Sequence, residues 1–302
     1  MPQPLIEEKE QLVTSPPTDR VVAVVNLLAG SGRTGGRTVS AIAAELGLNR
    51  STTTAVLTAL ESAGWVRRGE DLGYVLGAGL IGTGEAARRS LPLPRSTGEC
   101  LDALVEAVGG GVTMSLIEPG SLTVVEARHG GGRLLPGMSV GRQIQLVAPT
   151  GAAVMPWRSV AERGAWLATA PTGQRQMIIE LLELVSDSGV ALWRPKEDDA
   201  ALLDVLADLL DVADDQLLRP HLRQRVLAQL TKLAGRPYSR GELVSDDPLP
   251  ISYLAAPVFD KHGVARFEVQ LGPLRAAVPR VERDRYIAVL RETSRALSAG
   301  GS

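Results

Sequence analysis

Two short stretches near the N-terminus place apolar residues at the spacing of a helix. The first stretch holds Val39, Ile42, Ala43 and Leu46, and the second holds Val56, Leu57 and Leu60. Between them, Gly47 supplies the permissive backbone that a tight exit turn requires, and Asn49 is a residue type that caps helix N-termini. The pattern therefore predicts two short helices joined by a tight turn.

The stretch that follows Gly64 predicts a β-hairpin. It reads WVRRGEDLGYVL, which is two short apolar runs around a glycine-containing turn, with Arg67 and Arg68 on the first run. Two short helices followed by a hairpin are the order of a winged helix-turn-helix, here over residues 38–76. This order indicates double-stranded DNA as the first partner to consider.

Residues at the start of the second helix of such a motif meet the edges of bases, and the wing can touch phosphates. We therefore expect DNA contacts from Thr38, Arg50, Ser51, Thr53, Thr54, Arg67 and Arg68. Because side chains alternate along a strand, we expect only one of the two wing arginines to reach a phosphate. Thr52 is expected to pack toward the preceding helix.

The rest of the chain predicts a second domain with an antiparallel sheet. Its expected elements are a helix at 97–109, a hairpin around Pro119 and Gly120, a mostly helical stretch that includes 196–236, a hairpin around residues 261–263, and a last helix at 280–297. Hairpins flanked by helices indicate an α+β fold. The expected segments are a disordered tail at 1–18, a winged helix-turn-helix domain at 19–77 that opens with a helix capped by Asp19, a linker helix at 78–96 and the second domain at 97–302.

Positive charge is concentrated around the predicted motif. The whole chain has a net charge of −2, but residues 20–95 hold nine arginines against five acidic residues. Aromatic residues make up only 3% of the chain, which argues against single-strand binding by base stacking. Duplex recognition needs no aromatic platform, so the composition favours double-stranded DNA.

The sequence offers little for catalysis or metal binding. One cysteine excludes an internal disulfide and a cysteine-rich zinc site, and the three histidines have no Cys, Asp or Glu at ligand spacing. We therefore expect no metal, no cofactor and no enzyme activity. The sequence shows no run of 18 apolar residues and no signal-peptide core, so we expect a soluble, cytoplasmic protein with no membrane partner.

Two long segments together resemble the IclR family of bacterial transcriptional regulators. The first is SAIAAELGLNRSTTTAVLTALESAGWVRRG followed by GYVLGAGLIGTG, and the second is LAAPVFD followed by a strand that ends in Leu-Gly-Pro. The resemblance covers nearly all of residues 19–298. It implies a homodimer or homotetramer that binds operator DNA, as a repressor or an activator, without catalysis. It also implies a C-terminal α/β sensing domain, GAF/profilin-like, that binds a small-molecule effector and mediates oligomerisation.

The chain departs from the family pattern at several positions. Ala55 stands where the family often has an arginine, and Val269 and Leu271 stand where two serines of a Ser-x-Ser-Gly-Pro strand are common. The resemblance places effector-binding residues at Met114, Ala148, Thr150, Gly151, Tyr253, Val269 and Leu271. Because the two hydroxyl groups are replaced by apolar side chains, we expect an effector that is larger and less polar than a short organic acid.

Two alternatives remain open from the sequence. In the first, the winged helix binds DNA and the C-terminal domain is only a scaffold for oligomers. In the second, the protein is an enzyme or sensor whose winged helix serves protein contacts, although no nucleophile, metal or phosphate-binding motif supports this.

Overall fold

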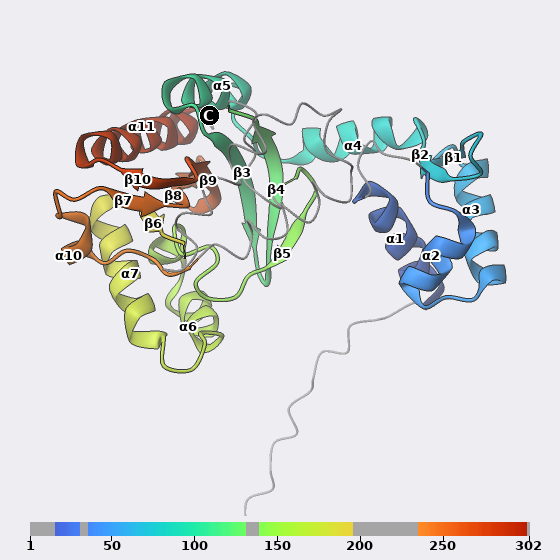
Figure 1. Cartoon of the computed structure of the whole chain (residues 1–302), viewed down its shortest axis with the longest axis horizontal. Helices are drawn as coiled ribbons and strands as arrows, with labels where there is room; N and C mark the ends of the chain where they lie inside the picture. Colours follow the sequence, from blue (N-terminus) through green and yellow to red (C-terminus); the bar gives the residue numbers. More distant parts are fainter. Residues whose placement is uncertain (1–15, 31–35, 131–138, 196–234, 301–302) are drawn as a thin grey trace, which may run out of the picture. The chain divides into compact units, whose positions relative to one another are not determined.

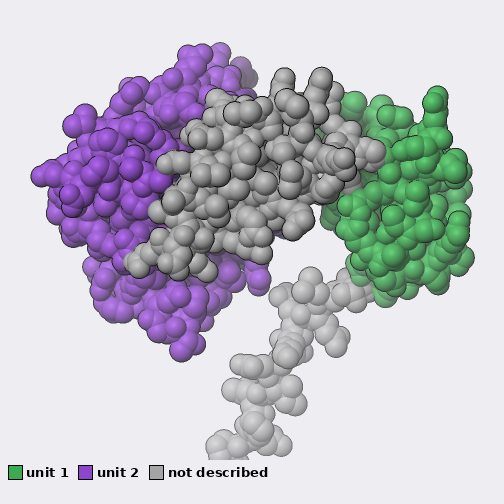
Figure 2. All heavy atoms as spheres, in the orientation of Figure 1, with its two compact units in different colours: residues 1–91 green, residues 92–302 purple. Residues whose placement is uncertain are grey.

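The computed structural model describes residues 16–30, 36–130, 139–195 and 235–300. The chain forms two compact units, residues 1–91 and 92–302, which Figure 2 shows in separate colours. Most of the expected N-terminal tail (residues 1–15) and most of the expected helical stretch (residues 196–234) lie outside the described residues.

The first unit contains the predicted helix-turn-helix and wing. Its elements are α1 (Pro16–Ala29), α2 (Val39–Leu46), α3 (Arg50–Ser62), β1 (Val66–Arg68), β2 (Tyr74–Leu76) and α4 (Gly79–Ser90). The helix α1 begins at Pro16, three residues before its expected cap at Asp19. The prediction that Asp19 caps this helix was wrong because proline is tolerated in the first turn of a helix, where its missing N–H has no intrahelical partner.

The turn between α2 and α3 has the geometry that the sequence predicts. Gly47 adopts a left-handed conformation with φ of 63°, and Asn49 caps α3 by accepting a hydrogen bond from the backbone N–H of Thr52 at 2.7 Å. The unit is held together by a small core, in which the buried members are Val24, Leu28, Ile42, Leu57, Leu60, Val66 and Tyr74. The core fixes α3 against α1, α2 and the wing.

The second unit is an α+β structure, as expected (Figure 1). Its elements are α5 (Thr97–Val108), β3 (Gly111–Glu118), β4 (Ser121–Arg128), β5 (Gln143–Gln145), the 3-10 helix η1 (Met155–Trp157), α6 (Val160–Ala168), α7 (Arg175–Ser188), β6 (Ala191–Trp193), α10 (Arg240–Leu243), β7 (Leu249–Ile251), β8 (Tyr253–Phe259), β9 (Ala265–Gly272), β10 (Arg275–Val278) and α11 (Arg280–Ala299).

A six-stranded antiparallel sheet forms the centre of this unit. Its strand order is β5-β4-β3-β9-β8-β6, and the two predicted hairpins are the β3–β4 and β8–β9 pairs. The helices α5 and α11 lie side by side and contact β3, β8 and β9 (Figure 1). The other face packs against the segment 148–155, α6 and α7 in one hydrophobic cluster. The sheet therefore has two covered faces, and its alternating side chains divide between them.

Candidate DNA-binding surface and candidate ligand pocket

The helix α3 has a buried stripe and an exposed stripe. Thr53, Leu57 and Leu60 are buried, and the exposed residues nearest its start are Arg50, Ser51, Thr54 and Ala55. Thr53 is 0% exposed, and its hydroxyl donates to the carbonyl oxygen of Asn49 at 3.0 Å. The expectation of a DNA contact from Thr53 is therefore wrong. Its spacing of four and seven residues from Leu57 and Leu60 places it in the core.

The hydroxyl groups at the start of both helices bond to their own backbone or cap. Thr38 is the N-cap of α2, where its hydroxyl oxygen accepts the backbone N–H of Ala41 at 3.3 Å. The Ser51 hydroxyl donates to Asn49 Oδ1 at 2.9 Å, and the Thr54 hydroxyl donates to the Arg50 carbonyl at 2.8 Å. The structure thus brings Arg50, Ser51 and Thr54 together on one exposed surface.

The wing places its two arginines on different faces. Arg67 is paired with Val75 and Arg68 with Tyr74 in the β1–β2 hairpin, and both arginines are exposed. The guanidinium carbon of Arg68 lies 5.7 Å from the centroid of the Tyr74 ring, so Arg68 lies over the core side of the hairpin. Arg67 points to the opposite face, as strand alternation requires.

Gly36 and Arg37, which come just before α2, hold the wing in place. Arg37 and Tyr74 exchange two backbone hydrogen bonds of 3.0 and 2.8 Å. A Cβ atom added to Gly73 would lie 2.4 Å from the backbone of Gly36, so this close approach requires glycine. The position of the wing is therefore set by backbone packing as well as by its own turn.

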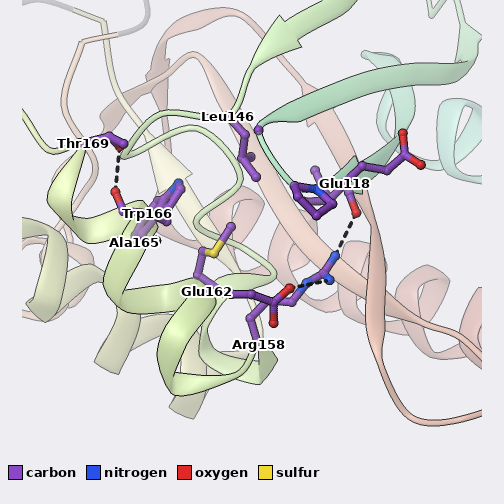
Figure 3. Close-up of a pocket in the computed structure, with 11 residues that line it drawn as sticks. Glu118, Leu146, Arg158, Glu162, Ala165, Trp166 and Thr169 are labelled. Atoms are coloured by element: carbon purple, nitrogen blue, oxygen red, sulfur yellow. Dashed lines mark hydrogen bonds and ion pairs between the residues drawn. The ribbon is translucent and has the colours of Figure 1, made fainter. Parts of the chain in front are cut away.

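A pocket of about 270 Å³ opens at the end of the β3–β4 hairpin, beside η1 and α6 (Figure 3). Its walls include Ile117, Leu146, Met155, Arg158, Glu162 and Trp166. The Arg158 side chain is only 12% exposed. Its Nη2 donates to the Ile117 carbonyl at 2.8 Å, its Nη1 lies 3.4 Å from Glu162 Oε1, and its buried Nε has no partner among the described residues.

Glu162 is a weak partner for Arg158 because it is committed elsewhere. Its other carboxylate oxygen accepts the hydroxyl of Ser159 at 2.7 Å and the Ser159 backbone N–H at 3.1 Å, which is a capping box at the start of α6. The hydrogen bonds from Ser159 hold the pKa of Glu162 below its usual value despite a smaller opposing effect of burial. The pocket therefore combines apolar walls with one incompletely paired cation.

Segment 148–151, where the sequence resemblance places effector contacts, is anchored to α6. The indole N–H of Trp166 donates to the Thr150 carbonyl at 2.9 Å, and the Ala148 N–H donates to the hydroxyl of Thr169 at 2.9 Å. Gly151 has a φ of 79°, and a Cβ atom there would lie 2.6 Å from Leu146. Tyr253 packs against the same hydrophobic cluster, with its ring stacked 4.5 Å from that of Trp193.

The other three expected effector residues lie on the opposite face of the sheet. The backbone N–H of Ala153 donates to Glu268, so Glu268 faces segment 148–155. Gln270 lies two residues further along the strand and therefore faces the same segment. Val269 and Leu271 alternate with them and must point toward α5 and α11. Met114 is paired with Val269 and shares that face. The expectation that Met114, Val269 and Leu271 line one site with Thr150 and Gly151 is therefore corrected, because the strand presents Glu268 and Gln270 there instead.

These two polar residues belong to a buried group that the sequence analysis missed. Glu268 is 1% exposed, and burial raises its pKa to about 7, although hydrogen bonds from Gln270 and Ala153 oppose the shift. Ser115 and Thr113 are paired with them on β3, and both hydroxyl groups are buried without a partner among the described residues. The run FEVQL resembles a strand with one solvated face, so its polar positions gave no signal of burial.

The described residues contain no group of three or more His, Cys, Asp or Glu side chains placed to hold a metal ion. Within the same residues, no helix has the length and apolar character needed to cross a bilayer.

Residues 17–70 match the family model of the IclR helix-turn-helix domain. No curated protein sequence matches the chain.

Three solved structures that are similar to nearly the whole chain carry the IclR name. An IclR transcriptional regulator from Alicyclobacillus acidocaldarius is 17% identical with a TM-score of 0.63, and the alignment covers 96% of this chain and 100% of that one. The IclR of Thermotoga maritima is 16% identical with a TM-score of 0.59, over 94% and 99% of the two chains. An IclR homologue from Microbacterium hydrocarbonoxydans, complexed with 4-hydroxybenzoate, is 15% identical with a TM-score of 0.57, over 93% and 98%. At these identities the likeness establishes the fold.

Proposed function

We propose, from the premise that residues 17–70 form an IclR helix-turn-helix domain, that this chain is a transcriptional regulator that binds operator DNA and responds to a small molecule. The observation that carries the proposal is the exposed face of α3, which begins with Arg50 and is oriented by a complete helix-turn-helix core. Arg50 is assigned to a base edge and Arg67 to a phosphate. Ser51 and Thr54 complete the contact surface, and Thr38 lies exposed at the start of α2.

An operator with two half-sites requires two copies of the chain, so we assign a homodimer or homotetramer. The helix α4 supports this because it buries none of its residues, and Ile81 on it is 67% exposed. Covering an apolar side chain of this size with a second copy of the chain stabilises the assembly.

Selection of bound fragments from genomic DNA with the purified chain tests the proposal. A shared sequence with two related half-sites is the expected result. Enrichment no greater than that of a pool taken through the same steps without protein would contradict DNA recognition.

The pocket of Figure 3 is the proposed effector site. Its apolar walls and the incompletely paired guanidinium of Arg158 favour an organic acid with a large apolar body. The bound 4-hydroxybenzoate of the Microbacterium homologue supports this chemical class. A ligand that prefers one arrangement of the domains would shift operator affinity by its difference in binding energy, typically about 1–3 kcal/mol.

We expect Arg158→Gln to weaken the binding of apolar acids about tenfold, or about 1.4 kcal/mol. A larger loss is not expected, because Glu162 already offsets part of the charge of Arg158. The measurement is a thermal-shift screen with aromatic and fatty acids, in which a ligand at 100 times its dissociation constant stabilises the protein by about 2.7 kcal/mol.

Glu162→Gln is the matched control for this prediction. Glutamine retains the capping box but removes the competing carboxylate, so acids are expected to bind this variant at least as tightly as the wild type. Equal loss of binding in both variants would point to damaged packing. No stabilisation by any acid would favour a second unit that serves only as an oligomerisation scaffold.

A further inference from the structure

The exposed face of α3 carries small side chains at regular spacing. Ser51, Thr54, Ala55 and Thr58 recur at intervals of three, four and seven residues, and all four are exposed. The helix has one basic residue, Arg50, and one acidic residue, Glu61, and it contains no Asn, Gln or Lys. A face of this composition lacks the amide side chains that read adenine in the major groove.

The hydroxyl protons of Ser51 and Thr54 on this face are already committed within the protein. Ser51 donates to Asn49 Oδ1 at 2.9 Å, and Thr54 donates to the carbonyl oxygen of Arg50 at 2.8 Å. Because the hydroxyl proton of Thr54 is used within the helix, the methyl group is the part of this exposed side chain that remains for an apolar contact. Ala55, the next residue of the helix, exposes a second methyl group.

Exposed methyl groups on a recognition helix complement one feature of the major groove. Thymine alone among the four bases projects a methyl group there, and alanine and threonine side chains make apolar contact with it. The absence of a large or charged side chain at Ala55 allows the backbone of α3 to approach the base edges closely.

We propose that α3 recognises thymine through its C5-methyl group, with Thr54 and Ala55 as the contacting residues. The proposal rests on the proposed DNA binding and names the bases that this binding selects. Arg50 then reads a different base pair of the half-site, where a guanine offers two acceptors.

The experiment replaces each thymine of the selected operator, one at a time, by deoxyuridine. The substitution keeps every hydrogen-bonding group and removes only the methyl. At one or two thymines of each half-site, the wild-type chain is expected to bind about fourfold more weakly, the value for removing one buried methyl from an apolar contact.

Thr54→Ser removes the partner methyl and keeps the hydroxyl. At the thymine that Thr54 contacts, this variant is expected to bind the thymine and deoxyuridine duplexes within about twofold of each other. Ala55→Gly is expected to do the same at a neighbouring thymine, and comparing two duplexes with one variant cancels any loss of helix stability. Thr172→Ser, the same chemical change in an exposed turn of the second unit, is expected to keep the full wild-type sensitivity.

Two failures are distinguishable. If no genomic sequence is selected, the proposed DNA binding itself fails. If an operator is selected but no single deoxyuridine weakens binding by more than about 1.5-fold, thymine recognition is overturned while DNA binding stands. Sensitivity to deoxyuridine that persists unchanged in both the Thr54→Ser and Ala55→Gly variants would overturn the assignment of these residues.

Discussion

Replacing Arg50 with alanine is expected to weaken operator binding by about 1–3 kcal/mol and to change binding to unrelated DNA much less. Arg50 is the first residue of α3, and its side chain is exposed at the helix end that enters the major groove in this class of motif. A guanidinium that bonds both acceptors of a guanine contributes to selection as well as to affinity. Removing this side chain is therefore expected to weaken the operator complex more than complexes with unrelated DNA.

The measurement compares the dissociation constants of the wild type and of Arg50→Ala for the operator and for a scrambled duplex at several salt concentrations. Arg67→Ala is the matched control, because Arg67 lies on the wing and not on α3. It is expected to weaken binding to both duplexes alike and to reduce the slope of log affinity against log salt by about one. Equal losses on both duplexes for Arg50→Ala would instead place Arg50 on a phosphate.

Local signals in the sequence predicted most elements of the fold. Gly47 and Asn49 predicted the turn between α2 and α3, and both have the predicted backbone and capping geometry. Pro119 and Gly120 predicted the β3–β4 hairpin, and the strand register confirms it. These features were predictable because a turn or a cap depends on the conformational preferences of one or two residues.

The candidate sites were predicted less well because they depend on which face of an element is covered. Thr53 carries a hydroxyl group like its neighbours, but the helical period places it beside Leu57 in the core. Val269 was expected in the ligand site because the family resemblance places a site residue at that position of the strand. The hydrogen bond between Ala153 and Glu268 shows which side of β9 faces segment 148–155. This contact joins residues more than a hundred positions apart, so no local sequence pattern predicts it.

The buried carboxyl group of Glu268 is expected to make the second unit less stable as the pH rises from about 4.5 to about 7. Burial raises its pKa from 4.5 to about 7, so the folded chain retains a proton over a range in which the unfolded chain releases it. The stability is highest below the unfolded pKa and declines until the folded group also ionises. This difference between the unfolded and folded pKa values corresponds to a loss of unfolding free energy on the order of 3 kcal/mol above pH 7.

Glu268→Gln is therefore expected to remove this pH dependence and to stabilise the second unit by a similar amount at pH 8. Glutamine keeps an oxygen that can accept the Ala153 N–H, and its amide can donate toward the hydroxyl of Ser115, which is paired with position 268 on β3. Below about pH 4 the carboxyl is protonated in both states of the wild type, so the two chains are expected to differ there by less than about 1 kcal/mol.

Urea unfolding followed by tryptophan fluorescence between pH 4 and pH 8 measures the effect, since Trp157, Trp166 and Trp193 all lie in the second unit. Glu118→Gln is the control, because Glu118 is an exposed glutamate at the end of β3 and its replacement should leave the wild-type pH profile unchanged. The decisive comparison is the slope of unfolding free energy against pH. Parallel slopes for the wild type and Glu268→Gln would show that Glu268 is ionised in the folded chain, and that a cationic or hydrogen-bond-donating partner stabilises its charge.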